Sequence, residues 1–156
     1  MKIRYVVGDA TAPSGPGPKV IAHVCNDIGK WGKGFVVAIS RRWPQPEEAF
    51  RRAYASAKKP ALGDVEFVRV EDDVVVANMI GQRGIARGAG GTPPIRYEAV
   101  LSALEKVGEY AEEHGATVHM PRIGAGLAGG SWEKIEPLIE EALSARGVQA
   151  IVYDLG

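Results

Sequence analysis

The sequence predicts a single α/β domain in which helices cover both faces of a sheet. Runs rich in β-branched residues alternate along the chain with segments whose apolar residues recur at helical spacing. One run, Val20–Cys25, is almost entirely apolar, which is typical of a strand that helices bury on both faces. Polar or glycine-rich breaks follow several strands, and no repeat or linker divides residues 1–156. We therefore expect one domain with a ligand site at the ends of its strands.

The composition fits one globular domain without a metal centre or a cofactor. The chain has 156 residues, of which 46% are hydrophobic and 24% are charged, enough to form a sizeable core. Its 19 basic and 19 acidic residues give a formal net charge of zero, so we expect no sequence-specific nucleic-acid binding. The single cysteine excludes an internal disulfide, and the three histidines have no metal-ligand spacing. Without a leader or an apolar run of about 20 residues, we expect a cytoplasmic monomer outside the membrane.

The first half of the chain predicts two strands, two short helices and a hairpin. The first strand ends at Gly8, before a loop rich in proline and glycine. Two β-prone runs separated only by the acidic turn 71–73 indicate the hairpin. The expected strands are Lys2–Val7, Val20–Cys25, Val65–Val70 and Val74–Asn78, and the expected helices are Phe35–Arg42 and Pro46–Lys58.

The second half predicts two helices that alternate with two strands. It begins with a glycine-rich loop over residues 81–94, whose length and lack of periodicity are typical of functional or mobile loops. Gly147 marks the end of the last helix. The expected helices are Ile95–Glu113 and Trp132–Arg146, and the expected strands are Val118–Met120 and Gln149–Tyr153.

The stretch 117–132, TVHMPRIGAGLAGGSW, predicts a phosphate-binding loop. A short strand ends at Pro121, and Ser131 stands where it would cap the helix that follows. Glycines at 124, 126, 129 and 130 let the backbone take positive φ and let a ligand approach the main chain. Because successive N–H groups beside a helix N-terminus favour phosphate, we expect a pyrophosphate here.

Two other interpretations of this loop are open. Gly124, Gly126 and Gly129 match the G-x-G-x-x-G spacing of dinucleotide-binding domains. That fold needs a second βαβ half, whereas one helix and one strand follow the loop here. Alternatively, the glycines serve only a tight connection between strand and helix. Four glycines in seven residues favour the phosphate interpretation.

Four such breaks follow strands, and we expect them to meet at one rim of the sheet: Gly8–Asp9, Asn26–Gly34, Gly81–Gly91 and Gly124–Gly130. Asp9 could accept a hydrogen bond from an adenine amine while the Ala10 amide donates to a ring nitrogen, although an Asx turn is the alternative. Asn26 and Asp27 could orient ribose hydroxyls or a water, or merely cap their turn.

The loop after the second strand combines Trp31 with Gly32 and Gly34. A flat side chain beside bare backbone could cover a sugar and donate amides to a phosphate, although buried tryptophan is commonly a core residue. His23, Cys25 and His119 lie inside apolar runs without acidic partners, and we interpret them as core residues.

Together these residues resemble the macrodomain family. The resemblance lies in GDAT after the first strand, HVCNDIGKWGKGF after the second and MPRIGAGLAGGSW before the last helix, and it covers nearly the whole chain. It implies a three-layer sandwich, with a mixed six-stranded sheet between helices and a cleft for ADP-ribose. The branch it resembles includes a chromatin-remodeller macrodomain, the small ADP-ribose 1″-phosphate phosphatase and the terminal ADP-ribose protein glycohydrolase.

The resemblance also implies roles for individual residues. Adenine would lie against Asp9 and Ala10 with Tyr153 beside it, and Asn26 would lie near the distal ribose. The residues expected around the pyrophosphate and distal ribose are Trp31, Gly32, Gly34, Phe35, Gln82, Gly124, Ala125, Gly126 and Leu127.

The sequence differs from that glycohydrolase at the residues that carry the glycohydrolase mechanism. Where it has a nucleophilic lysine and an aspartate, this chain has Gln82 or Arg83, and Ala128. These side chains cannot form a lysyl intermediate. We therefore expect hydrolysis of ADP-ribose esters on Glu or Asp of modified proteins, with a water held between Asn26 or Asp27 and the loop at Gly84. The alternatives are a binding module without chemistry and an ADP-ribose 1″-phosphate phosphatase.

Overall fold

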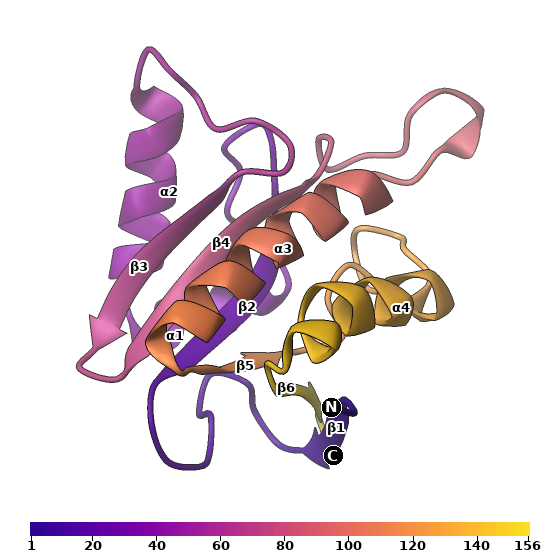
Figure 1. The fold of residues 1–156 in the computed structure, drawn as a ribbon. Coiled ribbons are helices and arrows are strands. Elements are labelled where there is room, and N and C mark those ends of the chain that lie inside the picture. The colour runs from indigo at the N-terminus through magenta and orange to yellow at the C-terminus, as the bar shows by residue number, and fades with distance from the viewer.

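A computed structural model describes residues 1–156 and contains one mixed six-stranded sheet in the order β1-β6-β5-β2-β4-β3. Every neighbouring pair is parallel except β3 and β4, which form an antiparallel hairpin. Figure 1 shows the two chain termini side by side at the β1 end of the sheet. The strands are β1 Arg4–Val7, β2 Lys19–Asn26, β3 Val65–Glu71, β4 Val74–Gln82, β5 Thr117–Met120 and β6 Ala150–Asp154.

Helices cover both faces of the sheet, as the sequence predicts (Figure 1). The side of α3 and α4 holds a core of 22 buried residues, and the side of α1 and α2 holds a core of 10. The central strand β2 contributes alternate residues to both cores, with Val20 and Ala22 on one side and Ile21 and Cys25 on the other. The helices are α1 Phe35–Arg42, α2 Gln45–Ala55, α3 Tyr97–His114 and α4 Trp132–Ala142.

The structure confirms the predicted α/β class but moves several boundaries. Strand β4 continues past Asn78 to Gln82, where the sequence predicts a loop from Gly81. A Cβ at Gly81 would lie 2.9 Å from Val100 Cγ2 and 3.1 Å from Val24 Cγ1. Gly81 is therefore a strand residue that lets α3 pack closely, because it has no side chain. The last helix ends four residues early, at Ala142, and a 3₁₀ turn over Ser144–Arg146 follows.

None of these helices is both long and apolar enough to span a membrane.

Helix α3 approaches the end of α4 closely at Gly108. A Cβ at this position would lie 2.5 Å from the backbone oxygen of Ala142. We expect Gly108→Ala to lower the free energy of unfolding by about 1–3 kcal/mol, because the helices must separate to admit the methyl group. Urea denaturation measures the change, and Glu109→Ala on the exposed face of α3 is the control. Equal stability of the two variants would contradict this account of the helix contact.

Candidate functional site

Four loops meet at the carboxyl ends of the parallel strands, as predicted from the sequence. They follow β1, β2, β4 and β5, whose shared direction brings their ends to one rim. Hydrogen bonds join two of them, since the Asp27 amide donates to the Gln82 oxygen at 3.1 Å and the Gly84 amide donates to Asp27 Oδ1 at 2.8 Å. The loops after β2 and β4 therefore form one connected wall.

The rim loops enclose a cleft with two adjoining cavities. The inner cavity, of about 260 Å³, lies between residues 33–36 and residues 121–128. The outer cavity, of about 590 Å³, lies toward β4 and is lined by Asn26, Trp31 and Gln82. The two share five lining residues: Val24, Lys33, Val36, Gln82 and Leu127. Because they share walls, we treat them as one cleft with the dimensions of a small-molecule site.

The N-terminus of α1 forms one wall of the inner cavity with free backbone amides. No intramolecular hydrogen bond uses the N–H groups of residues 32–36, and the first amide of this helix to bond within the chain is that of Val37, which donates to the Gly34 oxygen. Gly34 has φ 81°, a conformation that favours glycine. Free N–H groups and the positive end of a helix dipole make this wall suitable for an anion.

The loop after β5 faces α1 across the inner cavity. The amides of residues 126–128 are also free of intramolecular partners, while the Gly130 amide donates to the Gly124 oxygen at 2.7 Å and fixes the turn. Leu127 reaches across the cleft, so that a Cβ at Gly34 would lie 3.3 Å from its Cδ1. The two sets of amides therefore line opposite walls of one narrow space. Ser131 occupies the N-cap position of α4 but makes no side-chain capping bond, contrary to the prediction.

The charged side chains that line the cleft are all basic. Lys30, Lys33 and Arg51 line the outer cavity, Arg122 joins Lys33 in the inner one, and neither cavity is lined by Asp or Glu. Arg122 is held in place by a bidentate pair with Asp154, at 2.7 and 3.0 Å, and lies over the rings of Tyr5 and Trp132. This guanidinium lowers the pKa of the Asp154 carboxyl. The cleft thus suits a ligand with negative charge.

The inner cavity has a neutral histidine in its wall. His23 is buried, and its Nε2–H donates to Asn78 Oδ1 at 2.6 Å, since the Asn78 amide nitrogen donates to the Pro46 oxygen. Burial lowers the pKa of His23 to about 4. Cys25 and His119 are also buried, which confirms that all three residues belong to the core.

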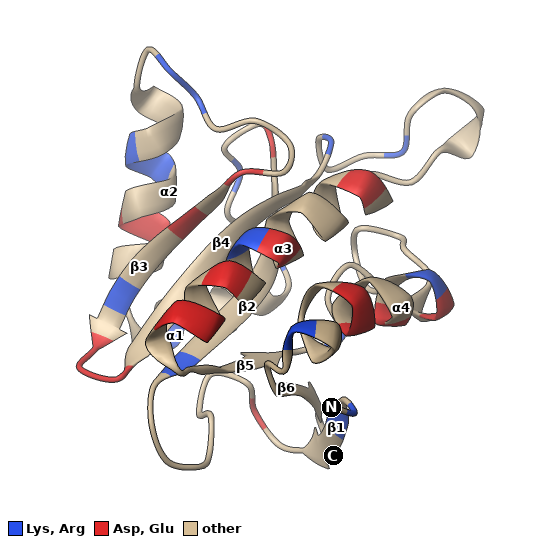
Figure 2. Ribbon diagram, in the orientation of Figure 1, with Lys and Arg blue, Asp and Glu red and all other residues tan.

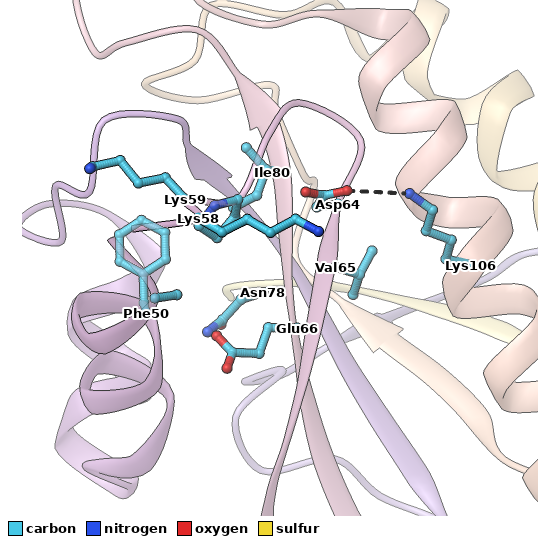
Figure 3. A pocket seen from close by; sticks show the side chains of 11 residues that line it. Phe50, Lys58, Lys59, Asp64, Val65, Glu66, Asn78, Ile80 and Lys106 are labelled. Atoms are coloured by element: carbon cyan, nitrogen blue, oxygen red, sulfur yellow. Dashed lines mark ion pairs between the residues drawn. The ribbon is translucent and has the colours of Figure 1, made fainter. Parts of the chain in front are cut away.

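A separate pocket of about 480 Å³ lies between α2 and β3 and shares no lining residue with the cleft (Figure 3). Figure 3 shows the ion pair between Lys106 and Asp64, and Glu66 also lines the wall. Burial raises the pKa of Glu66. Because this pocket mixes both signs of charge and none of its lining residues belongs to the four rim loops, it does not fit the predicted phosphate site.

The end of the rim beyond the inner cavity contains the residues predicted to contact adenine. Asp9 Oδ1 accepts from the amide and the hydroxyl of Thr11, both at 2.8 Å, so the alternative Asx turn is present. The Ala10 amide has no intramolecular partner. Ala10 packs with Tyr153 and Phe35 in a small cluster, and Tyr153 is buried. This end therefore offers one free amide, and a carboxylate with one oxygen left unbonded, beside an aromatic ring.

Asn26 caps its turn, which is one of the two roles that the sequence allows for it, and Gly84 is held by a neighbouring loop. The Asn26 amide oxygen accepts from the amides of Ile28 and Lys30, and its nitrogen donates to the Lys30 oxygen at 2.7 Å. The Gly84 amide is bonded to Asp27. The Asn26 amide oxygen and the Gly84 N–H thus hold the loops, and the catalytic roles expected for these two residues stay predictions. Asp27 keeps its second carboxylate oxygen.

For Trp31 the structure favours the alternative given by the sequence, a buried core residue. Its ring is 7% exposed, packs at 5.5 Å from His23, and donates from Nε1 to Ser40 Oγ at 2.8 Å. Trp31 is a core residue whose edge lines the cleft, and the glycines after it provide the free amides. Gln82 lines both cavities, and Ala128 is buried in the wall of the inner one.

Several residues of the cleft were missed from the sequence. Lys30 and Lys33 lie beside Trp31 in a loop that was already predicted to bind phosphate. Their positive charge could therefore have marked them as cleft residues. Arg51, on α2, and Ile85, in the loop after β4, carry no local pattern that marks them. Only the tertiary fold brings these two residues to the cleft.

The most informative similarity is to a solved structure of a macrodomain protein from Streptomyces coelicolor. The two share 55% sequence identity with a TM-score of 0.87, over 99% of this chain and 100% of the other. This chain belongs to the macrodomain family. No family model matches the sequence, so the assignment rests on such pairwise similarities.

Curated relatives carry macrodomains in different settings. The human ADP-ribose glycohydrolase OARD1 is 26% identical over 155 residues, which cover 99% of this chain and 92% of that protein. The zebrafish Chromodomain-helicase-DNA-binding protein 1-like is 32% identical over 161 residues, 97% of this chain. This macrodomain spans only 15% of the helicase's length.

Proposed function

We propose that this macrodomain binds ADP-ribose in the rim cleft and hydrolyses the ester that joins it to Glu or Asp of modified proteins. The observation that carries the proposal is the pair of free-amide rows, residues 32–36 and 126–128, on opposite walls of a cleft lined by no carboxylate. Two phosphates between these rows would accept hydrogen bonds from both sides. Similarity to an ADP-ribose glycohydrolase supports the ligand.

The proposed ligand lies along the rim in the order of the strands. Its adenine contacts Asp9 and the free Ala10 amide at the end of β1, beside Tyr153. Its pyrophosphate lies in the inner cavity, and its distal ribose enters the outer cavity near Gln82. The sheet order β1-β6-β5-β2-β4 supports this direction, since the two cavities lie on the β4 side of the adenine residues.

The proposed reaction is attack by water on the anomeric carbon of the distal ribose. A bond forms from the water oxygen to this carbon, and the bond to the ester oxygen breaks, so that the protein carboxylate leaves with the electron pair. The water proton passes to a phosphate oxygen of the ligand. The products are ADP-ribose and an unmodified Glu or Asp. Since a carboxylate is a good leaving group, orientation of the water and of the sugar is the main requirement.

Gln82 is the side chain best suited to orient this water. Its Nε2 donates to the Gly84 oxygen at 2.9 Å, while its Oε1 has no intramolecular partner. A neutral amide cannot act as nucleophile or base, and Ala128 offers no acid. The water must therefore attack directly, without a covalent intermediate.

We expect Gln82→Ala to lower kcat for an ADP-ribosylated glutamate peptide by about 10- to 100-fold, because the water and the sugar lose their orientation. The Kd for free ADP-ribose should change little, since the phosphates contact other residues. Stopped assays with mass spectrometry measure kcat, and calorimetry measures Kd. An unchanged kcat would remove Gln82 from the mechanism.

The experiment that tests the proposed function compares three activities of one preparation. Calorimetry measures binding of free ADP-ribose, mass spectrometry measures its release from a glutamate-linked peptide, and a colorimetric assay measures phosphate release from ADP-ribose 1″-phosphate. We expect binding and peptide hydrolysis. Binding without either reaction would identify a binding module, and phosphate release alone would identify a phosphatase.

A further inference from the structure

The reactive end of the cleft opens toward β4, in the outer cavity. On the proposed placement of the ligand, whatever is attached to the distal ribose must leave through this cavity. Its wall carries the basic residues Lys30, Lys33 and Arg51 and the aliphatic residues Ile85 and Leu127. This wall therefore contacts the group to which ADP-ribose is joined, and its chemistry should match that group.

The basic side chains of this wall are only partly paired with carboxylates, so the wall carries a net positive charge. Arg51 is paired with Glu47 at 2.9 Å, but neither Lys30 nor Lys33 takes part in an ion pair. The Asp27 carboxylate is not among the groups that line this cavity. Two unpaired ammonium groups at a cleft mouth attract an acidic partner, and such rim charges act mainly on association and partner choice.

The same wall also has exposed aliphatic side chains. Ile85 is 56% exposed and Leu127 is 68% exposed, although both line the cavity. Ile28, from the loop after β2, is 49% exposed. Bases of nucleic acids are usually bound by stacking on exposed aromatic rings, and the aromatic residue of this wall, Trp31, is buried. Aliphatic side chains beside ammonium groups suit a polypeptide instead.

The distribution of charge over the whole molecule also favours approach of an acidic partner to the outer cavity, although the net charge is zero. Figure 2 shows acidic residues concentrated on α3 and α4. These helices carry the glutamates at 98, 105, 109, 112, 113, 133, 136, 140 and 141, against two lysines. Helix α1 on the opposite layer has Arg41 and Arg42 and no acidic residue. An acidic partner is repelled from the α3–α4 layer and attracted to the cleft side.

We infer that the outer cavity is a docking subsite for an acidic polypeptide segment with apolar residues, the segment that bears the ADP-ribosylated side chain. The inference rests on the proposed function for the position of the ligand. Lys30 and Lys33 contact carboxylates that flank the modified residue, while Ile85 and Leu127 contact its apolar neighbours. The subsite thereby selects among modified proteins by the sequence around the modification.

The test uses peptides that differ only around the modification. ADP-ribose is joined through a non-hydrolysable triazole to peptides with acidic and apolar neighbours, with neutral neighbours or with basic neighbours, and to an oligonucleotide. Fluorescence anisotropy at low ionic strength measures each Kd, with free ADP-ribose as the reference. We expect the acidic peptide to bind about tenfold more tightly than the neutral one and to lose this advantage in salt. Equal binding of all peptides, or tightest binding of the oligonucleotide, would overturn the inference.

Two variants test whether the preference for the acidic peptide arises in the outer cavity. We expect Lys30→Glu to weaken binding of the acidic peptide by at least about fivefold more than it weakens binding of free ADP-ribose, because the reversed charge meets the carboxylates of the peptide as well as the ligand. Ile85→Ser should weaken binding of the same peptide, because an apolar contact is lost. Lys2→Glu is the control. Lys2 precedes β1 and therefore lies at the amino ends of the parallel strands, opposite the rim. A similar effect of Lys2→Glu would show general charge attraction and refute the subsite.

The same peptides with a natural ester linkage separate the two proposals. If the ester peptides stay intact while the acidic triazole peptide still binds more tightly, the proposed reaction fails and the subsite stands. If all ester peptides are hydrolysed with equal kcat/KM and the triazole peptides bind equally, the reaction stands and the subsite fails.

Discussion

Gly126→Glu is expected to weaken ADP-ribose binding by about 100-fold or more. Gly126 lies in the inner cavity, on the loop whose free amides face the N-terminus of α1. A carboxylate here would stand where the pyrophosphate is proposed to lie, and like charges in contact cost several kcal/mol, at about 1.4 kcal/mol per tenfold loss of affinity. Isothermal titration calorimetry measures the loss directly.

This substitution should leave the fold intact. A Cβ at Gly126 meets no atom within 4 Å, and its φ lies outside the left-handed region. Gly88→Glu is the matched control, because Gly88 has the same open surroundings but lies outside the cleft. We expect both variants to melt like the parent and only Gly126→Glu to lose binding. Full affinity in Gly126→Glu would refute the proposed position of the pyrophosphate.

Acid is expected to destabilise the protein between pH 6.5 and pH 4. Burial lowers the pKa of His23 to about 4, and burial followed by the charge of Lys19 lowers that of His119 to about 4. An unfolded histidine has a pKa of about 6.5. Because the folded values are lower, the unfolded chain binds the protons first. The stabilisation is therefore complete above pH 6.5 and is lost as the pH falls toward 4.

The expected loss from pH 7 to pH 5 is about 2 kcal/mol of unfolding free energy for each of these histidines. Urea denaturation at the two pH values measures it, and histidine proton resonances followed by NMR report the two pKa values. His114→Gln is the control, because His114 is the third histidine of the chain and is exposed at the end of α3. Stability that stays constant between pH 7 and pH 5 would contradict the assignment.

Most of the fold could be predicted because local signals agreed with it. Helix α1 occupies the predicted residues, and the acidic turn before β4 makes the predicted hairpin. The errors arose where tertiary packing overrides a local pattern. Gly81 was expected to begin a loop, yet it is buried in β4 because α3 leaves no room for a side chain.

The candidate site was predicted in its backbone and less well in its side chains. Glycine spacing located both rows of amides, since backbone geometry at glycine follows from the local sequence. The partners of Asn26 and the burial of Trp31 depend on groups in other segments, such as Ser40. The outer cavity shows the same limit, because it combines Arg51 from a helix with Ile85 from a distant loop.

The pairing of β1 with β6 has a consequence for how binding competence is acquired. Arg4 lies opposite Ile151, so this pair closes almost the entire chain into a loop, whereas β2, β4 and β5 assemble without it. We expect such a long closure to form late in folding, because its entropic cost is greater than that of the shorter closures. A partly folded molecule would hold the pyrophosphate walls before the nucleobase end exists, and affinity for adenosine compounds would then report completion of folding rather than its onset.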